Sequence, residues 1–345
     1  MANITWIIGN GFDLNIGLNT RYIDFYKEYI KNIPDNNVVI QNFKKEILRD
    51  ESNGWKNWAD FESGMGKQSR LYNGEKSADD FISCFRDFIN CFHSYLENEC
   101  LKIRWEEINN EILNIFKNSI TNIINQITSV RNGIVKEITN KYSNSISLNS
   151  LQLNYTNVFD ELLSRSGLNM NINFHLHGAL NKNPVMGVDD MEQIENEVIR
   201  NDTRIQKIFV KQGYLSLLQN VDVNKPNPDR LAQSIISSTN IFCFFGVSIG
   251  DTDMHWWKEI GERLRNSDSL LIIFDVCGQI LNNIDPVIVL EAQTVIDDRR
   301  NGIINRFLRL SGLGEDWILN NHDRIIVELD RPIFNFKLPL KEPIQ

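Results

Sequence analysis

Short apolar runs recur along the chain, and most of them end at a glycine or a polar residue. The runs at 241–245 and 270–274 are apolar throughout, and the mostly apolar run at 3–8 stops at Gly9. Strands that are buried on both faces carry this pattern, which is typical of a parallel sheet covered by helices. Further strands are predicted at 146–153, at 172–176 and, as an edge strand, at 324–329. The pattern therefore predicts an α/β fold built on a parallel sheet.

Between these runs, apolar residues recur at the three- and four-residue spacing of amphipathic helices. One such stripe lies within 253–265 and consists of Trp256, Trp257, Ile260 and Leu264. Together with the runs on either side, this helix predicts a βαβ unit. Thr20 is expected to be the N-cap of another helix, of about a dozen residues.

The stretch from 40 to 140 contains helical patterns and no convincing strand. We therefore expect one α/β nucleotide-binding domain, formed by 1–39 and 141–345, with a helical insertion at 40–140. The insertion enters directly after the first strand and helix, beside the carboxyl edge of the sheet. It is expected to pack against the core or a second subunit and to control access to a site there. The alternative is a helical subdomain that only completes the core.

Composition narrows the class of protein. The chain has 345 residues, and its net charge of −9 argues against a sequence-independent grip on nucleic acid. The strongest basic run is expected on a solvated helix face and consists of Arg299, Arg300, Arg306 and Arg309. Five cysteines without a CxxC pair predict reduced thiols. Because no signal peptide and no apolar stretch of membrane-spanning length is visible, we expect a cytoplasmic protein that does not contact membranes.

A glycine-containing segment follows the first predicted strand directly. Residues 9–14 read Gly-Asn-Gly-Phe-Asp-Leu, and a helix is expected to start there. In such a strand–loop–helix arrangement, glycines let the backbone approach a phosphate, and free N–H groups meet the anion. The spacing differs from GxGxxG, and a plain βα turn explains the glycines equally well when the motif stands alone.

The same segment is similar to the opening signature of a known family. Residues 9–14, then Gly17-Leu18 and Thr20-x-Tyr22-x-Asp24-Phe25, resemble the start of the AbiH family of phage abortive-infection proteins. AbiH proteins in turn resemble the sirtuin-like branch of NAD-binding domains. The resemblance covers most of the chain through separate motifs and implies a Rossmann-like sheet that binds NAD. Cofactor contacts are then expected from Gly9, Asn10, Gly11, Phe12, Asp13, Thr20 and Tyr22.

Two later motifs fit this resemblance and supply catalytic candidates. Residues 153–160 resemble the Asn-Tyr-Asp segment of sirtuin-like NAD-hydrolysing domains, whose Asn holds the nicotinamide ribose or its attacking water. Asn154 matches that Asn, whereas Thr156 stands where those domains usually have Asp. Residues 174–180 resemble the strand that ends in His-Gly, and His177 matches its catalytic base. The structural alternatives are that Asn154 caps a turn and that His177 is a satisfied core histidine.

A second histidine lies two residues before the first. His175 has the strand parity of His177, so both are predicted to face one side. A metal site is not expected, because no further His or Cys lies nearby to complete it and the sirtuin zinc ribbon is absent.

A glycine- and aspartate-containing segment follows the run at 241–245. It resembles the Gly-x-Ser-x-x-Asp segment of sirtuin-like domains, which implies cofactor contacts from Gly246, Ser248 and Asp251. Asp253 is expected only to cap the next helix. Asp275 ends the following strand, where an acidic residue can bind an adenosine ribose. Glu62 and the segment 184–190 also fit the AbiH resemblance; Glu62 is interpreted as a surface carboxylate, and no role follows for the segment.

All these motifs fall at the carboxyl ends of predicted strands, where open α/β sheets bind ligands. The expected function is that of a phage-defence effector that hydrolyses the nicotinamide–ribose bond of NAD, with NAD as substrate and no prosthetic group or metal. Its expected partners are further copies of itself and an unknown phage trigger, but not nucleic acid. The alternatives are a module that senses NAD or ADP-ribose without turnover, and an effector that targets nucleic acid.

Overall fold

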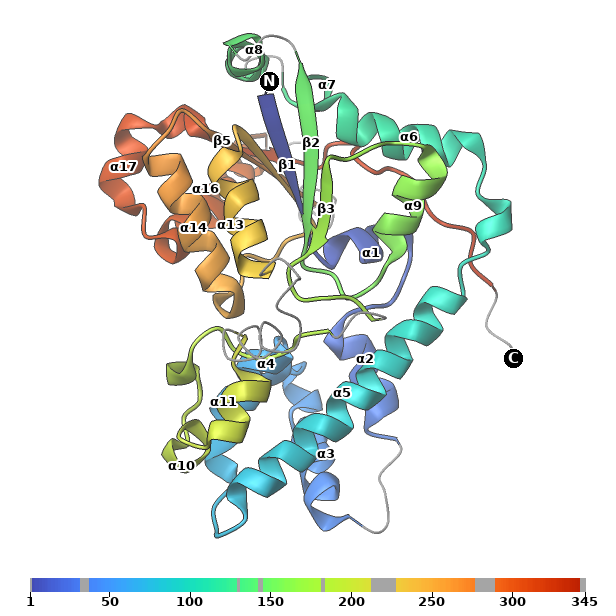
Figure 1. Cartoon of the computed structure of the whole chain (residues 1–345), viewed down its shortest axis with the longest axis vertical. Helices are drawn as coiled ribbons and strands as arrows, with labels where there is room; N and C mark the ends of the chain where they lie inside the picture. The colour runs from blue at the N-terminus through green and yellow to red at the C-terminus, as the bar shows by residue number, and fades with distance from the viewer. Residues whose placement is uncertain are drawn as a thin grey trace.

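The computed structural model describes residues 2–31, 37–128, 131–141, 145–180, 184–211, 228–276 and 289–341. Six strands form one fully parallel sheet in the order β3-β2-β1-β4-β5-β6 (Figure 1). They are β1 (Ala2–Ile8), β2 (Ile146–Gln152), β3 (Ile172–His175), β4 (Ile241–Phe245), β5 (Leu270–Asp275) and β6 (Ile325–Leu329). This is the strand order of a doubly wound Rossmann sheet, whose direction of growth reverses between β1 and β4. The predicted α/β class with a Rossmann-like parallel sheet is confirmed.

Side chains of the central strands alternate between two hydrophobic clusters, one on each face of the sheet. In β1, Trp6 and Ile8 belong to one cluster and Ile7 to the other. The first face is covered by α1 (Gly11–Ile16), α6 (Asn110–Thr121), α7 (Ile123–Gln126), α8 (Asn132–Lys141) and α9 (Val158–Ser166). The second is covered by α13 (Pro228–Ser238), α14 (Met254–Arg265), α16 (Val289–Ser311) and α17 (Gly314–Asn320). Burial on both faces explains why β4 and β5 are apolar throughout.

A third hydrophobic cluster lies outside the sheet, in a helical lobe drawn below it in Figure 1. The lobe is defined here as residues 22–101 and 186–210. It contains α2 (Tyr22–Tyr29), α3 (Val38–Arg49), α4 (Phe61–Gln68), α5 (Ser77–Leu101), α10 (Glu197–Arg200) and α11 (Thr203–Phe209). Aromatic rings fill its centre; Phe209 of α11, for example, packs edge-on against Phe81 and Phe85 of α5.

The packing divides the chain differently from the predicted boundaries at 39/40 and 140/141. Helix α2 precedes residue 40 but packs in the lobe, through Phe25, Tyr26 and Tyr29. Helices α6 and α7 fall inside 40–140 and α8 ends one residue beyond it, but all three lie on the sheet, where Phe116 shares a cluster with Trp6. The periodicity of a helix shows which of its faces is apolar, but not which surface that face covers.

Most predicted elements are found within a residue or two of their expected bounds, including the βαβ unit β4-α14-β5 and the edge strand β6. The start of α2 differs, because Arg21 and not Thr20 occupies its N-cap position. Short 3-10 helices complete the described chain: η1 (Glu51–Asn53), η2 (Lys56–Trp58), η3 (Ser69–Leu71), η4 (Trp105–Glu107), η5 (Met191–Gln193), η6 (Asp251–Asp253) and η7 (His322–Arg324).

Candidate functional site

A cleft of about 1030 Å³ opens at the carboxyl ends of the strands, between the sheet and the helical lobe. The loops after β1, β2, β4 and β5 contribute to its wall, as do α2 and the segment around α4. This is the switch point of the sheet, where doubly wound folds bind their ligands. Most of the predicted site residues line it: Gly9, Asn10, Gly11, Asp13, Thr20, Tyr22, Asn154, His177, Gly246, Ser248 and Asp275.

Two predicted cofactor contacts do not line the cleft. Phe12 is fully buried on the first face of the sheet, with its ring against those of Phe159 and Phe334. Asp251 forms an exposed ion pair with Arg309 (Nη2 to Oδ1, 3.3 Å). Phe12 follows the core periodicity of a helix that packs on the sheet, which the motif resemblance did not take into account.

The loops that follow β1 and β4 touch each other through their backbones. The N–H groups of Gly9 and Gly11 donate to the carbonyl oxygens of Phe245 (3.0 Å) and Gly246 (2.9 Å). Gly246 has a φ of 68°, which favours glycine. The expectation that the glycines leave their N–H groups free for an anion is therefore wrong for Gly9 and Gly11. These glycines permit close contact between two loops, and Thr20 and Asn10 exchange hydrogen bonds on the cleft side of them.

Replacing Gly11 with alanine is expected to destabilise the protein by roughly 1–3 kcal/mol or more. The added Cβ would lie 2.4 Å from Gly246 Cα, so one backbone must move. Gly302, on α16, is the control, because a Cβ there meets nothing within 4 Å. Alanine at Gly302 should be neutral or stabilising, by up to about 1 kcal/mol. Denaturant unfolding of both variants checks this, and equal effects at the two positions would contradict it.

Asn154 is held at the floor of the cleft with its side chain unsatisfied. It follows β2 and is 2% exposed, and neither Nδ2 nor Oδ1 has a hydrogen-bond partner among the described residues. Buried amide groups are nearly always paired, so an unpaired one at a cleft wall suits a ligand. The alternative that Asn154 caps a turn is wrong for its side chain, because such a cap requires an amide hydrogen bond.

The two histidines of the third motif have different surroundings. Strand β3 ends at His175, so the strand alternation on which their predicted common side was based does not extend to His177. The His175 ring lies between the Asn154 carbonyl (Nδ1, 2.9 Å) and Asp160 Oδ2 (Nε2, 2.9 Å). It therefore links α9 to the backbone that carries the Asn154 side chain. His177 lines the cleft and is 5% exposed.

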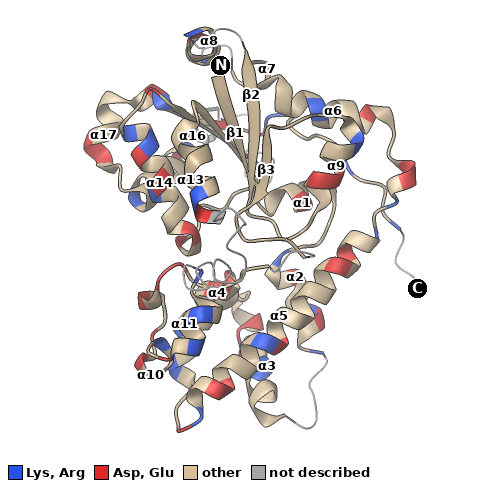
Figure 2. Ribbon diagram, in the orientation of Figure 1, with Lys and Arg blue, Asp and Glu red and all other residues tan. Residues whose placement is uncertain are grey.

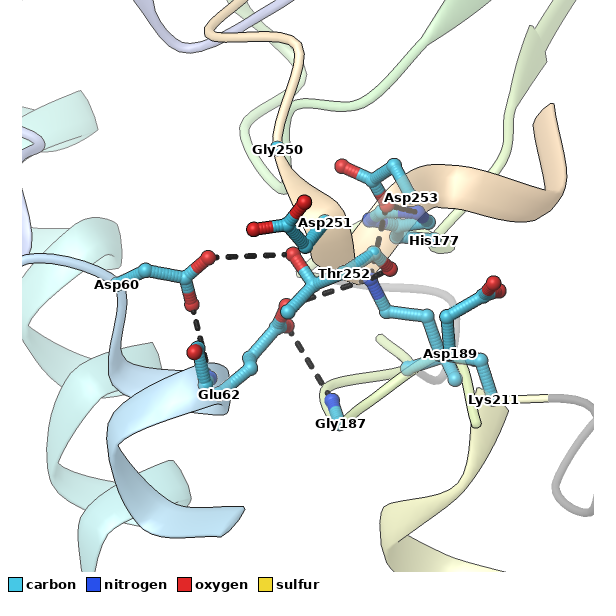
Figure 3. A network of polar contacts seen from close by, with 12 residues as sticks. Asp60, Glu62, His177, Gly187, Asp189, Lys211, Gly250, Asp251, Thr252 and Asp253 are labelled. Atoms are coloured by element: carbon cyan, nitrogen blue, oxygen red, sulfur yellow. Dashed lines mark hydrogen bonds and ion pairs between the residues drawn. The ribbon is translucent and has the colours of Figure 1, made fainter. Parts of the chain in front are cut away.

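A buried network of charges surrounds His177 (Figure 3). His177 Nε2 lies 2.9 Å from Asp253 Oδ1, an ion-pair distance, although the ring is not aligned for a regular hydrogen bond. The same Asp253 oxygen accepts a hydrogen bond from Lys211 Nζ (2.9 Å), and Nζ lies 3.2 Å from Glu62 Oε2. Glu62 Oε1 accepts from the Tyr155 hydroxyl (3.0 Å). The network joins the lobe to the loop after β4.

The pKa values in this network follow from burial and the Lys211 charge. Burial alone would lower the pKa of Lys211, but the carboxylates of Asp253 and Glu62 outweigh it and raise that pKa. Burial opposes ionisation of Asp253, yet Lys211 and His177 bring its pKa well below the usual range. For Glu62, burial prevails over Lys211 and raises the pKa. Asp253, 2.9 Å from Nε2, is the carboxylate that lies directly beside His177.

Two interpretations of acidic residues are corrected by this network. Asp253 stands at the N-cap position of α14 but makes no side-chain cap bond. The backbone N–H of His255, near the start of that helix, donates instead to Asp189 (2.9 Å). Glu62 is 5% exposed and lines the cleft, so it is not a surface carboxylate. Lys211 pairs with both Glu62 and Asp253, and it lies far from each of them in the sequence. Asp189, which accepts from the start of α14, is likewise distant from that helix in the sequence.

Sequence reasoning missed Lys211, and it gave no role to the segment 184–190. The structure connects them: Val188 N donates to the Phe209 carbonyl (2.8 Å), and Lys211 N donates to the Val188 carbonyl (2.9 Å). Gly187 N donates to Glu62 Oε1 (3.2 Å), and Val185 N donates to the His177 carbonyl (2.7 Å). The segment thus fixes Lys211, Glu62 and His177 relative to one another. A lone lysine outside any motif carried no signal that could have identified it.

The far end of the cleft carries a carboxylate–guanidinium pair. Asp275 accepts two hydrogen bonds from Arg299 of α16 (2.7 and 3.1 Å). A ligand ribose at Asp275 must therefore share this carboxylate with Arg299.

The loop after β4 has a strained backbone beside Ser248. Ile249 has a φ of 51°, a strained conformation for a β-branched residue, and its buried side chain holds it there.

Outside the cleft, the distribution of charge and the composition add little to the functional interpretation. Lys and Arg are interspersed with Asp and Glu over the helices of both halves (Figure 2). In the predicted basic run, Arg299, Arg300 and Arg309 form ion pairs with Asp275, Asp297 and Asp251, respectively. In the described ranges, no group of three or more His, Cys, Asp or Glu side chains is arranged to hold a metal ion. None of the described helices combines the length and apolar character needed to cross a bilayer. Four cysteines are free thiols, and Cys277 lies outside the described residues.

Comparison with known families gives a match over most of the chain. The family model described as "Bacteriophage abortive infection AbiH" matches residues 5–275, which run from within β1 to the end of β5 and include nearly all residues that line the cleft. No curated protein matches the chain significantly.

Proposed function

The chain belongs to the AbiH family of bacteriophage abortive-infection proteins, and from that premise we propose that it hydrolyses the nicotinamide–ribose bond of NAD in this cleft. One observation carries the proposal: the unpartnered Asn154 amide and His177 line the same cleft at the switch point of a Rossmann sheet. This matches the arrangement that the sirtuin-like resemblance implies. The products are nicotinamide and ADP-ribose.

The arrangement suits this chemistry. Nicotinamide leaves a pyridinium cation as a neutral molecule, so the reaction needs no strong general acid. It needs a group that positions the ribose and its attacking water, and a base for a proton from water or a ribose hydroxyl. Asn154 can position through its free amide. His177 can act as the base, and Asp253, 2.9 Å from its Nε2, orients the ring.

The rest of the cleft supports a dinucleotide ligand. Its volume of about 1030 Å³ exceeds what a single nucleoside needs. Arg21 and Lys337 are among its lining residues and supply positive charge for a pyrophosphate, whereas the charge of Arg299 is balanced by Asp275. Asp275 and Arg299 stand at the end of β5, where the adenosine ribose is expected.

Incubation of the purified protein with NAD tests the proposal. Chromatography should show free nicotinamide and ADP-ribose in equal amounts, and the variant His177→Ala should produce little of either. In cells, NAD should fall after phage challenge with the wild type and not with this variant. Calorimetric binding of NAD without nicotinamide release would favour the sensing module instead. The absence of binding, release and cellular NAD loss would overturn the proposal.

A further inference from the structure

Asp13 is a buried carboxyl group that borders the floor of the cleft. It lies in α1, is 1% exposed and is among the lining residues. Its Oδ2 accepts a hydrogen bond from the Thr156 hydroxyl (2.7 Å), whereas Oδ1 has no partner among the described residues. One carboxyl oxygen is therefore fixed by the protein, and the other is enclosed beside the cleft without a well-aligned donor among the described residues.

The unpaired oxygen of Asp13 has an unpaired neighbour. The Asn154 amide lies within hydrogen-bonding reach of Asp13 and lowers its pKa, although neither amide atom is aligned for a regular hydrogen bond with any described residue. The two side chains thus offer two acceptors, Asp13 Oδ1 and Asn154 Oδ1, and one donor, Asn154 Nδ2. A water molecule complements this set, because it donates twice and accepts through its lone pairs.

The ionisation of Asp13 suits proton transfer near neutral pH. Burial raises its pKa to about 7, although the hydroxyl of Thr156, the amide of Asn154 and the charge of His175 each act to lower it. Among the described residues, Cys100 of α5 also interacts with Asp13; burial raises the pKa of this thiol to about 12, so it stays neutral. A carboxyl of this kind exists in both protonation states near pH 7, as a general base must.

We propose that Asp13 takes the proton from the water that attacks C1′ of the nicotinamide ribose, while the amide of Asn154 holds that water. The inference rests on the proposed NAD hydrolysis. The water oxygen bonds to C1′, the C1′–nitrogen bond breaks, and nicotinamide leaves with the electron pair. The water proton moves to Asp13 Oδ1 and from there to solvent. His177, beside Asp253, is left to interact with a ribose hydroxyl.

The variant Asp13→Asn tests this assignment, because it keeps the shape of the side chain and an acceptor for Thr156. Nicotinamide release should fall by about 10²-fold, the loss expected for a general base. Sodium azide, a nucleophile that carries no proton at neutral pH, should restore release by Asp13→Asn about tenfold or more but not release by His177→Ala. Asp323→Asn, at an exposed residue of η7 paired with His322, is the control and should match the wild type.

A second variant keeps the carboxyl group. Thr156→Val removes the hydroxyl that stabilises the Asp13 carboxylate, so the acidic limb of the pH profile of kcat/KM should move to higher pH. A wild-type protein that releases no nicotinamide would overturn the proposed function and this inference together. If the wild type is active, two results would overturn this inference alone. One is a rate of nicotinamide release by Asp13→Asn within about threefold of the wild-type rate. The other is an acidic limb that does not move in Thr156→Val.

Thermal unfolding gives a readout that does not depend on activity. The raised pKa means that ionised Asp13 destabilises the folded state, and that this penalty grows as pH rises from 3.8 to about 7. Asp13→Asn should therefore melt above the wild type at pH 8, with a smaller difference at pH 5. A variant that melts below the wild type at pH 8 would contradict a buried carboxyl with a raised pKa.

Discussion

Alanine at Asn154 or at His177 is expected to reduce nicotinamide release by about 10²-fold or more, the range for loss of a positioned acid–base group. The two side chains line one cleft at adjacent strand ends. Asn154 contributes an amide with no other partner, and His177 contributes a ring held beside Asp253. Each is expected to act on the same ribose, so the loss of either leaves the other without a correctly placed substrate. Initial rates of nicotinamide formation measure the effect.

The double variant sharpens this prediction. Residues that act in one step are non-additive, so Asn154→Ala combined with His177→Ala should be little worse than either single variant. His322→Ala is the matched control, because that histidine is exposed and outside the cleft. Fully multiplicative effects would mean that Asn154 and His177 act independently, and single losses of only a few-fold would remove both from the chemistry.

The fold was predictable where the burial of an element determines its pattern of apolar residues. Strands such as β4 and β5 are covered on both faces, so their unbroken apolar runs specify central parallel strands. The lobe was not predictable in the same way. Helix α2 and the segment 186–210 pack there with α5, although about 85 residues separate the end of α5 from that segment. An apolar stripe fixes the buried face of a helix, whereas the choice of partner depends on contacts far apart in sequence.

The site was predictable only where residues follow strand ends. Parallel strands bring their carboxyl ends to one edge, so Gly9, Asn154 and Gly246 were expected to meet, and the structure places them on one cleft. Residues that reach the cleft from the lobe obey no such rule. Glu62 is fixed there by Lys211, which follows α11, and neither side chain stands in a motif that would indicate burial. The glycines likewise matched a phosphate-binding motif but serve a loop–loop contact.

Replacing Lys211 with methionine is expected to cost about 3–5 kcal/mol of stability at pH 7, because it leaves buried carboxylates without their cation. Lys211 is 5% exposed, and its Nζ also donates to the Thr252 carbonyl (2.8 Å). It is the cation between Glu62 of the lobe and Asp253 of the α/β unit. The same variant should lower activity, because Asp253 would no longer be held beside His177. Denaturant unfolding measures the stability loss, and nicotinamide release measures the activity.

The pH dependence of this loss identifies its electrostatic origin. In the wild type, Asp253 has a pKa below the ordinary value of 3.8, and this shift contributes stability to the folded state. The contribution is fully present above pH 3.8 and is lost only at strongly acidic pH. Without Lys211, the buried carboxylates should have raised pKa values, so the loss should shrink as pH falls from 7 toward 5 and they take up protons. Adding Glu62→Gln to Lys211→Met should recover part of the stability, because one buried charge is removed. Lys141→Met, at an exposed ion pair with Asp268, should cost less than about 1 kcal/mol. A loss that is equal at both pH values, or unaffected by Glu62→Gln, would mean that Lys211 stabilises the lobe contact by packing alone.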